Sequence, residues 1–332
     1  MRRIRRSLEL GRMVGAAERE NRCNVAGSTA DRQRLYRAVK AGKLISPLKG
    51  LYVRPELWND LGKEEQAKYL MKGLQHRFPG WIFAGRSAAL VHGLWVSHSD
   101  LLPLQIAVSK QKDGRPGSLA KRITIEGDPF AVVDGLRVTS FERTVFDCLR
   151  SMDFAHGLAI ADSALREKKW DLEHLKEVVE GMPHRCKGWA TAMNTASFAD
   201  PRAESGGESI ARARMLLFGY EPPDLQVPLS SVVDGDSYRG DFGWHLSPNE
   251  LLIGELDGHE KYTNAKMTKG RSVVDVLTDE RLRESRMSAP GVRIMRFSYK
   301  EMMDDARFVK ILDSYGVPKV DGSLTLTDKR HG

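Results

Sequence analysis

Cysteine is scarce in this chain, and no long apolar run interrupts its polar background. The 332 residues include only Cys23, Cys148 and Cys186, which are far apart and form no Cys-x-x-Cys pair. This pattern excludes a disulfide framework and a cysteine-based structural zinc site, and it predicts a reducing, cytoplasmic setting. No apolar stretch approaches the roughly 20 residues of a membrane-spanning helix, and the basic first residues lack the apolar core of a secretory signal. We therefore expect neither a membrane protein nor a secreted one.

The excess of positive charge is confined to the N-terminal end of the chain. The net charge is +8, and residues 1–60 contain 14 Lys and Arg against 6 Asp and Glu, whereas the rest of the chain contains 38 of each sign. A localised basic region is typical of proteins that bind a polyanion, usually nucleic acid. For residues 1–24 taken alone, a solvated N-terminal helix is the alternative.

The length predicts two or three domains, since a domain has about 100–200 residues. We expect an α/β chain of the α+β multidomain kind, with an N-terminal winged helix, a mixed αβ middle domain and a C-terminal mixed sheet flanked by helices. A stretch rich in Gly, Pro and charged residues, residues 200–207, predicts a linker between the last two. The expected parts are residues 1–61, 62–199 and 200–318, followed by a tail, 319–332.

The N-terminal part predicts the end of a winged helix-turn-helix. Asp31 can cap a short helix whose apolar face carries Leu35, Tyr36 and Val39. Residues 44–54 then predict two short strands around a turn. In such a motif the helix enters the major groove and the hairpin touches phosphates. A small αβ element with ordinary surface charges is the alternative. The expected DNA contacts are the basic side chains of the helix and the hairpin: Arg32, Arg34, Arg37, Lys40, Lys43, Lys49 and Arg54.

The remaining elements follow from apolar periodicity. In the middle part we expect a helix that ends near residue 76, strands at 103–109, 121–126 and 136–139, helical segments from 140 onward and a helix at 172–180. In the last part we expect a helix at 210–217 that Ser205 opens, and strands at 225–229, 238–245, 251–257 and 292–297. Pro228 indicates that the first of these last strands lies at a sheet edge.

Two acids interrupt the nearly continuous apolar strand at 251–257. Glu255 and Asp257 are two positions apart, so both point to the same face of the strand. A hairpin turn at 247–250 would place Leu246 opposite Leu251 and Asp241 opposite Leu256, and a bulge would bring Asp241 onto the face of the two acids. Three converging carboxylates predict a hard divalent cation, Mg²⁺ or Mn²⁺, and metal-activated water of that kind hydrolyses phosphodiesters.

Two further residues are candidates for this chemistry. Lys261 could orient the water or stabilise the transition-state charge. Glu208 could deliver a fourth acid from its helix. The structural alternatives are that Asp257 begins a simple turn, that Glu255 pairs with a buried Arg, that Lys261 is solvent-exposed, and that Glu208 closes a capping box on Ser205.

Five segments follow one another across about 110 residues of the C-terminal part: Glu204–Arg212, Pro222–Gln226, Asp241–Trp244, Glu255–Tyr262 and Glu280–Arg286. In their order and spacing these segments resemble the Vsr-like branch of the PD-(D/E)XK nuclease superfamily. The resemblance implies a restriction-endonuclease-like mixed sheet flanked by helices and Mg²⁺-dependent DNA cleavage. It implies that Asp241 and Glu255 hold the metal, that Asp257 assists and that Glu208 is the helical acid. Asp257 stands where the superfamily usually has lysine, so Lys261 or His259 would replace that lysine.

Four upstream segments extend over about 120 residues: Arg34–Leu44, Lys49–Val53, Gly85–Gly93 and Val138–Asp147. These segments resemble the AbiEi-like antitoxins of bacterial abortive-infection systems. In that context Arg86, Ser87, Arg143 and Asp147 are expected to be structural, and the spacing of Arg143 and Asp147 favours an ion pair along a helix.

Two functions follow as hypotheses. The first is a DNA-binding, Mg²⁺-dependent endonuclease, in bacterial phage defence or a toxin–antitoxin setting. The second is a non-enzymatic, antitoxin-like transcriptional repressor whose C-terminal domain is a degenerate nuclease. Either function has DNA as its partner and admits a protein partner, a toxin or a defence component.

Overall fold

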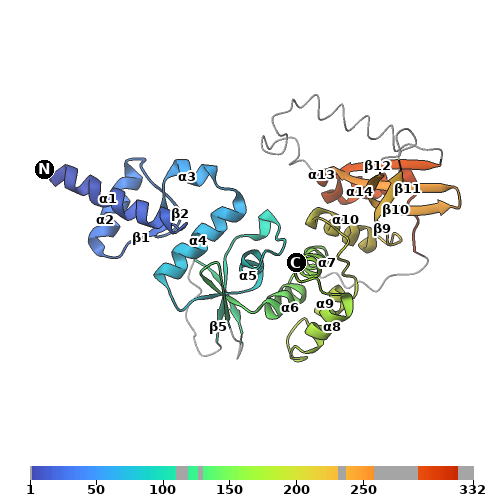
Figure 1. Ribbon diagram of the computed structural model, residues 1–332, viewed down its shortest axis with the longest axis horizontal. Helices are drawn as coiled ribbons and strands as arrows, with labels where there is room; N and C mark the ends of the chain where they lie inside the picture. The colour runs from blue at the N-terminus through green and yellow to red at the C-terminus, as the bar shows by residue number, and fades with distance from the viewer. Residues whose placement is uncertain (1, 110–118, 126–129, 231–236, 258–290, 321–332) are drawn as a thin grey trace, which may run out of the picture. The chain divides into compact units, whose positions relative to one another are not determined.

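The computed structural model describes residues 2–109, 119–125, 130–230, 237–257 and 291–320, drawn in colour in Figure 1. Contacts divide the chain into two compact units, Met1–Ser151 with Val178–Trp189, and Met152–Glu177 with Ala190–Gly332. The expected α/β class is confirmed at this level, since the described residues form helices and three sheets. The boundaries expected near residues 61 and 199 stay predictions.

The first unit begins with a motif of helices around a three-stranded sheet of order β1-β3-β2. Its elements are α1 (Arg2–Arg19), β1 (Asn24–Val25), α2 (Thr29–Lys40), β2 (Ile45–Leu48), β3 (Leu51–Val53) and α3 (Pro55–Asp60). The core of this motif is formed by Val14, Leu35, Ala38 and Leu44.

Helix α2 differs from the expectation at two residues. Its N-cap is Ser28, whose side chain accepts a hydrogen bond from the Asp31 amide at 3.1 Å, so Asp31 lies inside the first turn and is not the cap. Tyr36 is 58% exposed and is not on the apolar face. The buried positions are Leu35 and Ala38, three residues apart, and this spacing turns residue 36 toward solvent.

The rest of the first unit is built on a five-stranded sheet of order β6-β5-β4-β8-β7. Its strands are β4 (Ile82–Phe83), β5 (Gln105–Val108), β6 (Lys121–Thr124), β7 (Phe130–Val133) and β8 (Leu136–Thr139), and its helices are α4 (Lys63–Arg77), α5 (Gly85–Val91) and α6 (Phe141–Ser151), with a short 3-10 turn η1 (His98–Asp100). Helix α4 packs against β1 and β3 and also against β8, so it joins the N-terminal motif to this sheet.

The residues expected to be structural in this region are internally bonded. The predicted ion pair of α6 is confirmed, with Arg143 Nε 2.9 Å from Asp147 Oδ2. Arg86 pairs with Asp100. The Ser87 hydroxyl accepts a hydrogen bond from the Gln105 amide at 2.9 Å.

The second unit contains a four-stranded mixed sheet of order β12-β11-β10-β9. Strands β11 and β12 are parallel and the other neighbours are antiparallel. Strand β9 lies at an edge, which confirms the expectation from Pro228. The elements of the unit are α7 (Phe154–Lys168), most of α8 (Leu172–Glu180) and of α9 (Trp189–Ser197), α10 (Gly206–Leu217), β9 (Asp224–Ser230), β10 (Ser237–Ser247), β11 (Glu250–Asp257), β12 (Val292–Ser298), α13 (Tyr299–Met303) and α14 (Asp305–Tyr315).

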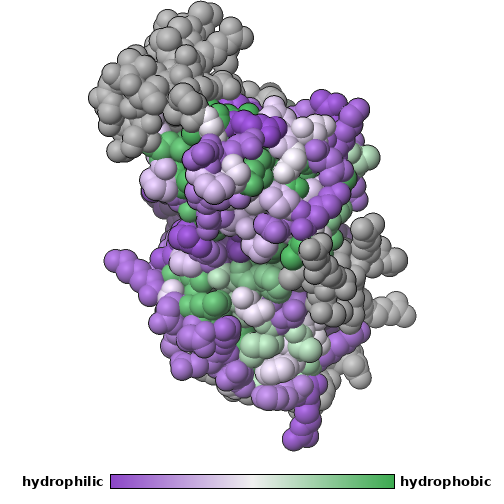
Figure 2. All heavy atoms as spheres, turned by 90° about the vertical axis from the view of Figure 1, so that its right-hand side faces the viewer, coloured by the Kyte–Doolittle hydropathy of each residue, from purple (hydrophilic) through white to green (hydrophobic). Residues whose placement is uncertain are grey.

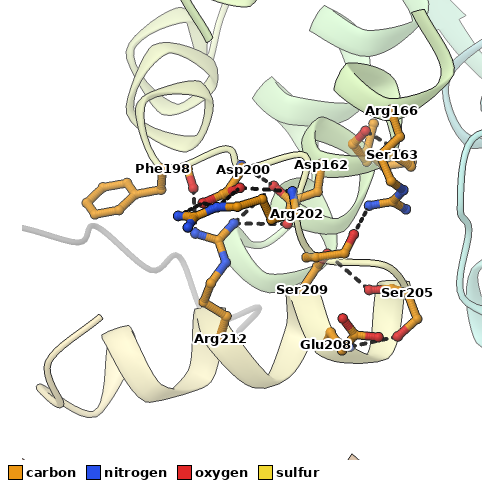
Figure 3. A network of polar contacts seen from close by, with 12 residues as sticks. Asp162, Ser163, Arg166, Phe198, Asp200, Arg202, Ser205, Glu208, Ser209 and Arg212 are labelled. Atoms are coloured by element: carbon orange, nitrogen blue, oxygen red, sulfur yellow. Dashed lines mark hydrogen bonds and ion pairs between the residues drawn. The ribbon is translucent and has the colours of Figure 1, made fainter. Parts of the chain in front are cut away.

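Helices α7 and α10 pack together around a buried ion pair (Figure 3). Arg212 on α10 donates to both carboxylate oxygens of Asp162 on α7, at 3.0 and 2.9 Å, and the two residues are 7% and 0% exposed. The Arg212 guanidinium also donates to the Phe198 carbonyl at 2.7 Å. Asp162 accepts a further hydrogen bond from the Asp200 amide at 2.7 Å.

The stretch predicted as a linker is held in place by these contacts. Asp200 is bonded through its amide, and the Ala203 carbonyl accepts a hydrogen bond from Arg166 on α7. Ser205 then caps α10 as expected, because its hydroxyl accepts the Glu208 amide at 3.1 Å. The stretch therefore runs along the second unit as an ordered connection.

In the described parts of the chain, no helix has the length and apolar character that crossing a membrane requires. Figure 2 shows one face of the molecule, on which hydrophilic and hydrophobic residues are interspersed.

The buried pair generates a stability prediction. Arg212→Met is expected to lower the free energy of unfolding by about 3–5 kcal/mol, because it leaves the Asp162 carboxylate buried without its cation. The matched control is Arg202→Met, since Arg202 pairs with Asp200 at 2.7 Å but its side chain is 58% exposed. The control should cost about 0–1 kcal/mol. Urea denaturation of both variants measures the difference, and equal midpoints would contradict the prediction.

Candidate functional site

The first candidate site is the solvent-exposed side of α2 together with the hairpin that follows it. The basic side chains that lie exposed there, called the basic surface from here on, are Arg32, Arg37, Lys40, Lys43 and Lys49. Lys49 occupies the turn of the hairpin, where Leu48 pairs with Leu51. Gly50 in the same turn has a φ of +82°, which favours glycine. Five of the seven predicted DNA contacts are therefore exposed on α2 and on the connection and hairpin that follow it.

The other two predicted contacts form ion pairs within the motif. Arg34 lies 2.8 Å from Glu9 and 3.0 Å from Asp31, and is half-buried. Arg54 lies 3.3 Å from Glu18. Glu9 and Glu18 both belong to α1, so these two arginines tie the hairpin and α2 to the first helix.

Tyr36 is a member of the first candidate site that sequence reasoning assigned to the core. Its ring is exposed, and the ammonium group of Lys40, one turn later, lies 5.7 Å from the ring centroid. Arg32, Tyr36 and Lys40 are spaced by four residues, which places them on one side of the helix. This spacing could have indicated the exposure of Tyr36 from the sequence, because a tyrosine on the same side of a helix as two basic residues lies on its polar side.

The second candidate site is a row of polar residues across the sheet of the second unit. At the hairpin, Ser247 pairs with Glu250, and a bulge lies between Ser247 and His245. Beyond the bulge, His245 pairs with Leu251, so the predicted pairing of Leu246 with Leu251 is wrong. Phe242 pairs with Gly254 in the shifted register. One residue further, Asp241 stands level with Glu255. The bulge therefore moves Asp241 to the face of the acids, as the sequence allowed.

Glu255 has its cationic partner on the neighbouring strand. Arg296 on β12 is its partner in the parallel register, and Arg296 Nη2 lies 2.8 Å from Glu255 Oε2. The same guanidinium places Nη1 3.8 Å from Asp257 Oδ1. Glu255 is 9% exposed and the Arg296 side chain is 22% exposed, so the structure contains a Glu–Arg pair, the alternative to a metal ligand, with a half-buried arginine in place of the buried one expected. Asp241 accepts a hydrogen bond from the Leu256 amide at 2.9 Å.

Glu208 forms hydrogen bonds at the start of α10, close to the sheet edge. Its Oε2 accepts the Glu204 amide at 2.8 Å and the Gln226 side-chain amide at 3.1 Å. The Glu208 carboxylate thus accepts the backbone amide of Glu204, the residue before Ser205, and not the amide of Ser205 that a capping box would use. Figure 3 shows Glu208 beside Ser205 at the N-terminus of the helix.

Gln226 is a residue of this site that sequence reasoning missed. It lies in β9 with a φ of +56°, which is uncommon for a residue other than glycine. Val227 pairs with Gly240 and Leu225 with Phe242, so Gln226 lies level with Asp241. Each of the four strands therefore contributes one residue to a row that crosses the sheet. The row consists of Gln226, Asp241, Glu255 and Arg296, and it is called the carboxylate row after its two acids.

The metal prediction stays a prediction, and the described residues bear on it as follows. No three His, Cys, Asp or Glu side chains among them are grouped closely enough to hold a metal ion. Asp241 and Glu255 stand side by side as oxygen donors, which suit Mg²⁺, and Arg296 already neutralises Glu255. Lys261 and His259 lie outside the described residues.

Other titratable groups are accounted for by local structure. Burial raises the pKa of Cys23 to about 12 and also raises the pKa of Cys148, so both thiols stay protonated. His92 Nε2 lies 2.9 Å from the Thr139 carbonyl, and His156 Nδ1 lies 2.8 Å from the Asp153 carboxylate. The two histidines are thus bonded to neighbouring residues of their own units.

No family model matches the chain. Over 167 residues it is 29% identical to the uncharacterized proteins Rv2248 and MT2308 of two Mycobacterium tuberculosis strains. The alignment covers 46% of this chain and 59% of each relative, so the chain spans less than two thirds of the proteins it matches. Among solved structures it is similar to the crystal structure of the Rv2827c protein of Mycobacterium tuberculosis, with 15% identity and a TM-score of 0.34, over 56% of this chain and 70% of that chain.

The contacts of Glu208 generate a prediction about its role. Glu208→Ala is expected to lower the free energy of unfolding by about 1–3 kcal/mol, because two hydrogen-bond donors lose their common acceptor. Glu208→Gln keeps an acceptor oxygen and should cost less. Urea denaturation separates the two variants, and an Ala variant as stable as the parent would exclude a structural role for this carboxylate.

Proposed function

We propose that this chain is a DNA-binding protein that binds double-stranded DNA through the basic surface of its N-terminal motif. The observation that supports the proposal is the two-sided character of α2. Leu35 and Ala38 are buried on one side, while Arg32, Arg37 and Lys40 are exposed on the other. A helix held in this way can enter a major groove while a hairpin touches the backbone.

The charges of the basic surface suit a duplex backbone. Phosphate contacts from Lys and Arg release counterions from DNA, and this release gives affinity without requiring a particular sequence. Lys43 and Lys49 extend the surface from the helix to the hairpin turn. Exposed Tyr36 lies between the basic side chains and offers an apolar contact to a base edge. The resemblance to AbiEi-like antitoxins supports a regulatory use of this binding, as in a transcriptional repressor.

Removal of two charges from the basic surface tests the proposal. The double variant Arg37→Ala and Lys40→Ala is expected to weaken duplex binding and to reduce the slope of log K against log salt by about 1.8, since each lost phosphate contact removes about 0.9. Fluorescence anisotropy of a labelled duplex over a salt series measures both quantities.

The matched control for this experiment removes two lysines from the second unit. Lys300 and Lys310 are exposed and carry the same total charge. The double variant Lys300→Ala and Lys310→Ala should leave the affinity and the salt slope close to those of the parent. If both double variants weaken binding equally, binding depends on the overall charge of the protein and not on the basic surface, and the proposal is wrong.

A second candidate function, a metal-dependent endonuclease, is supported by the level placement of Asp241 and Glu255 on adjacent strands. Their carboxylates would hold Mg²⁺ or Mn²⁺, with Asp257 close by. Such a metal, when bound, supplies activated water and neutralises the charge that develops on the phosphate. The mixed sheet with flanking helices is of the kind that the Vsr-like resemblance implies.

Plasmid cleavage tests this second candidate. Supercoiled DNA is incubated with the protein and Mg²⁺, Mn²⁺ or EDTA, beside the variants Asp241→Ala and Glu255→Ala. Cleavage should require metal and be lost in both variants. Glu250→Ala is the control, because Glu250 lies on the same strand but pairs with Arg293 away from the row, at 3.1 Å. Cleavage that persists in the Asp241→Ala variant would rule out this site.

A further inference from the structure

We propose that Arg296 is the resident cation of the carboxylate row and competes with a divalent metal ion for Glu255. The inference rests on the second candidate function, because it concerns the site that a nuclease metal would use. Its consequence is that this site binds metal weakly until the guanidinium of Arg296 releases Glu255.

The position of Arg296 is imposed by the backbone. In the parallel ladder of β11 and β12, Glu255 is the partner of Arg296, and Asp257 is the partner of Ser298. Partners in neighbouring strands point to the same face of a sheet. Arg296 therefore emerges beside Glu255 on the face of the acids, and its 2.8 Å contact requires no unusual reach.

One guanidinium serves two carboxylates. The planar group of arginine presents several donors in a fixed fork, which suits simultaneous contact with more than one oxygen. Arg296 uses Nη2 for Glu255 and directs Nη1 toward Asp257, 3.8 Å away. The two acids two positions apart thus share one cation.

Burial makes this pair consequential for metal binding. The side chain of Glu255 is 11% exposed and that of Arg296 is 22% exposed. An ion pair largely removed from water is screened less than one at the surface. A divalent cation that binds Glu255 has to overcome this attraction and would then stand near a displaced positive charge. This competition weakens metal binding at the site, because the free energy of the ion pair between Arg296 and Glu255 is lost when the metal binds.

Manganese titration followed by electron paramagnetic resonance measures the competition directly, without reference to cleavage. The full-length parent is compared with Arg296→Met and Arg296→Gln, which remove the charge, and with Arg296→Lys, which keeps it. The neutral variants should bind Mn²⁺ about tenfold more tightly than the parent, and the lysine variant should resemble the parent. Combining Arg296→Gln with Glu255→Gln should abolish the gain.

The matched control is Arg293→Met, on the same strand, since Arg293 pairs with exposed Glu250 and not with the row. It should leave Mn²⁺ affinity unchanged. Circular dichroism checks folding, and Arg296→Gln serves if Arg296→Met does not fold. Unchanged, weaker or undetectable Mn²⁺ binding in the folded neutral variants overturns the proposal. Tighter binding without plasmid cleavage would uphold the role of Arg296 while removing the endonuclease function.

Discussion

The buried ion pair of Asp162 and Arg212 determines how the helices of the second unit meet. Burying each ion costs several kcal/mol, and only a well-bonded partner offsets that cost. Arg212 meets both oxygens of Asp162 and the Phe198 carbonyl, while the Asp200 amide adds a donor to Asp162. We infer that such a specific set of bonds selects one register of α7 against α10. The start of α10 is thereby fixed, and Glu208 is brought to Gln226 at the sheet edge.

Arginine is used in opposite ways in the two candidate sites. In the N-terminal motif, Arg34 and Arg54 bond to α1, whereas the arginines and lysines of the basic surface are exposed to solvent. Among the described residues this arrangement leaves an exposed surface of positive charge, of the kind that the proposed DNA binding requires. In the second unit, Arg296 supplies the counter-charge from within the sheet. The first site would therefore attract the proposed polyanion by long-range charge, whereas in the second site one of the acids, Glu255, already has a cationic partner.

Much of the fold follows from the sequence, because apolar periodicity and turn residues are local signals. The helix at 172–180 is confirmed as α8, and the expected strands at 121–126, 136–139, 225–229 and 238–245 correspond to β6, β8, β9 and β10. The short strands β4 and β7 were not anticipated, since two to four residues carry little periodicity. For the cap of α2, Ser28 and Asp31 are both capping residues, and only the backbone geometry shows that Ser28 takes the role.

The carboxylate row was less accessible to sequence reasoning. The acids and their shared face could be anticipated from Glu255 and Asp257, but the bulge between His245 and Ser247 changes the register by one residue and is set by the backbone. Arg296 could not be chosen as a partner, because the pairing of β11 with β12 joins segments distant in sequence. Gln226 is an ordinary strand residue by type, and its left-handed backbone conformation is visible only in three dimensions.

The parallel pairing of β11 with β12 also bears on the order in which the second unit folds. Strands β10 and β11 adjoin in sequence and can pair early, whereas β12 begins at Val292, far along the chain from the end of β11 at Asp257, so the pairing of these two strands is a long-range contact. Bringing two distant segments together costs chain entropy, and this cost has to be met before the strand contacts can stabilise the pair. A chain with the hairpin formed and β12 undocked would expose the acids of β11 and an open strand edge. Docking of β12 thus brings Arg296 to the acids and covers a strand edge that could otherwise pair with other chains.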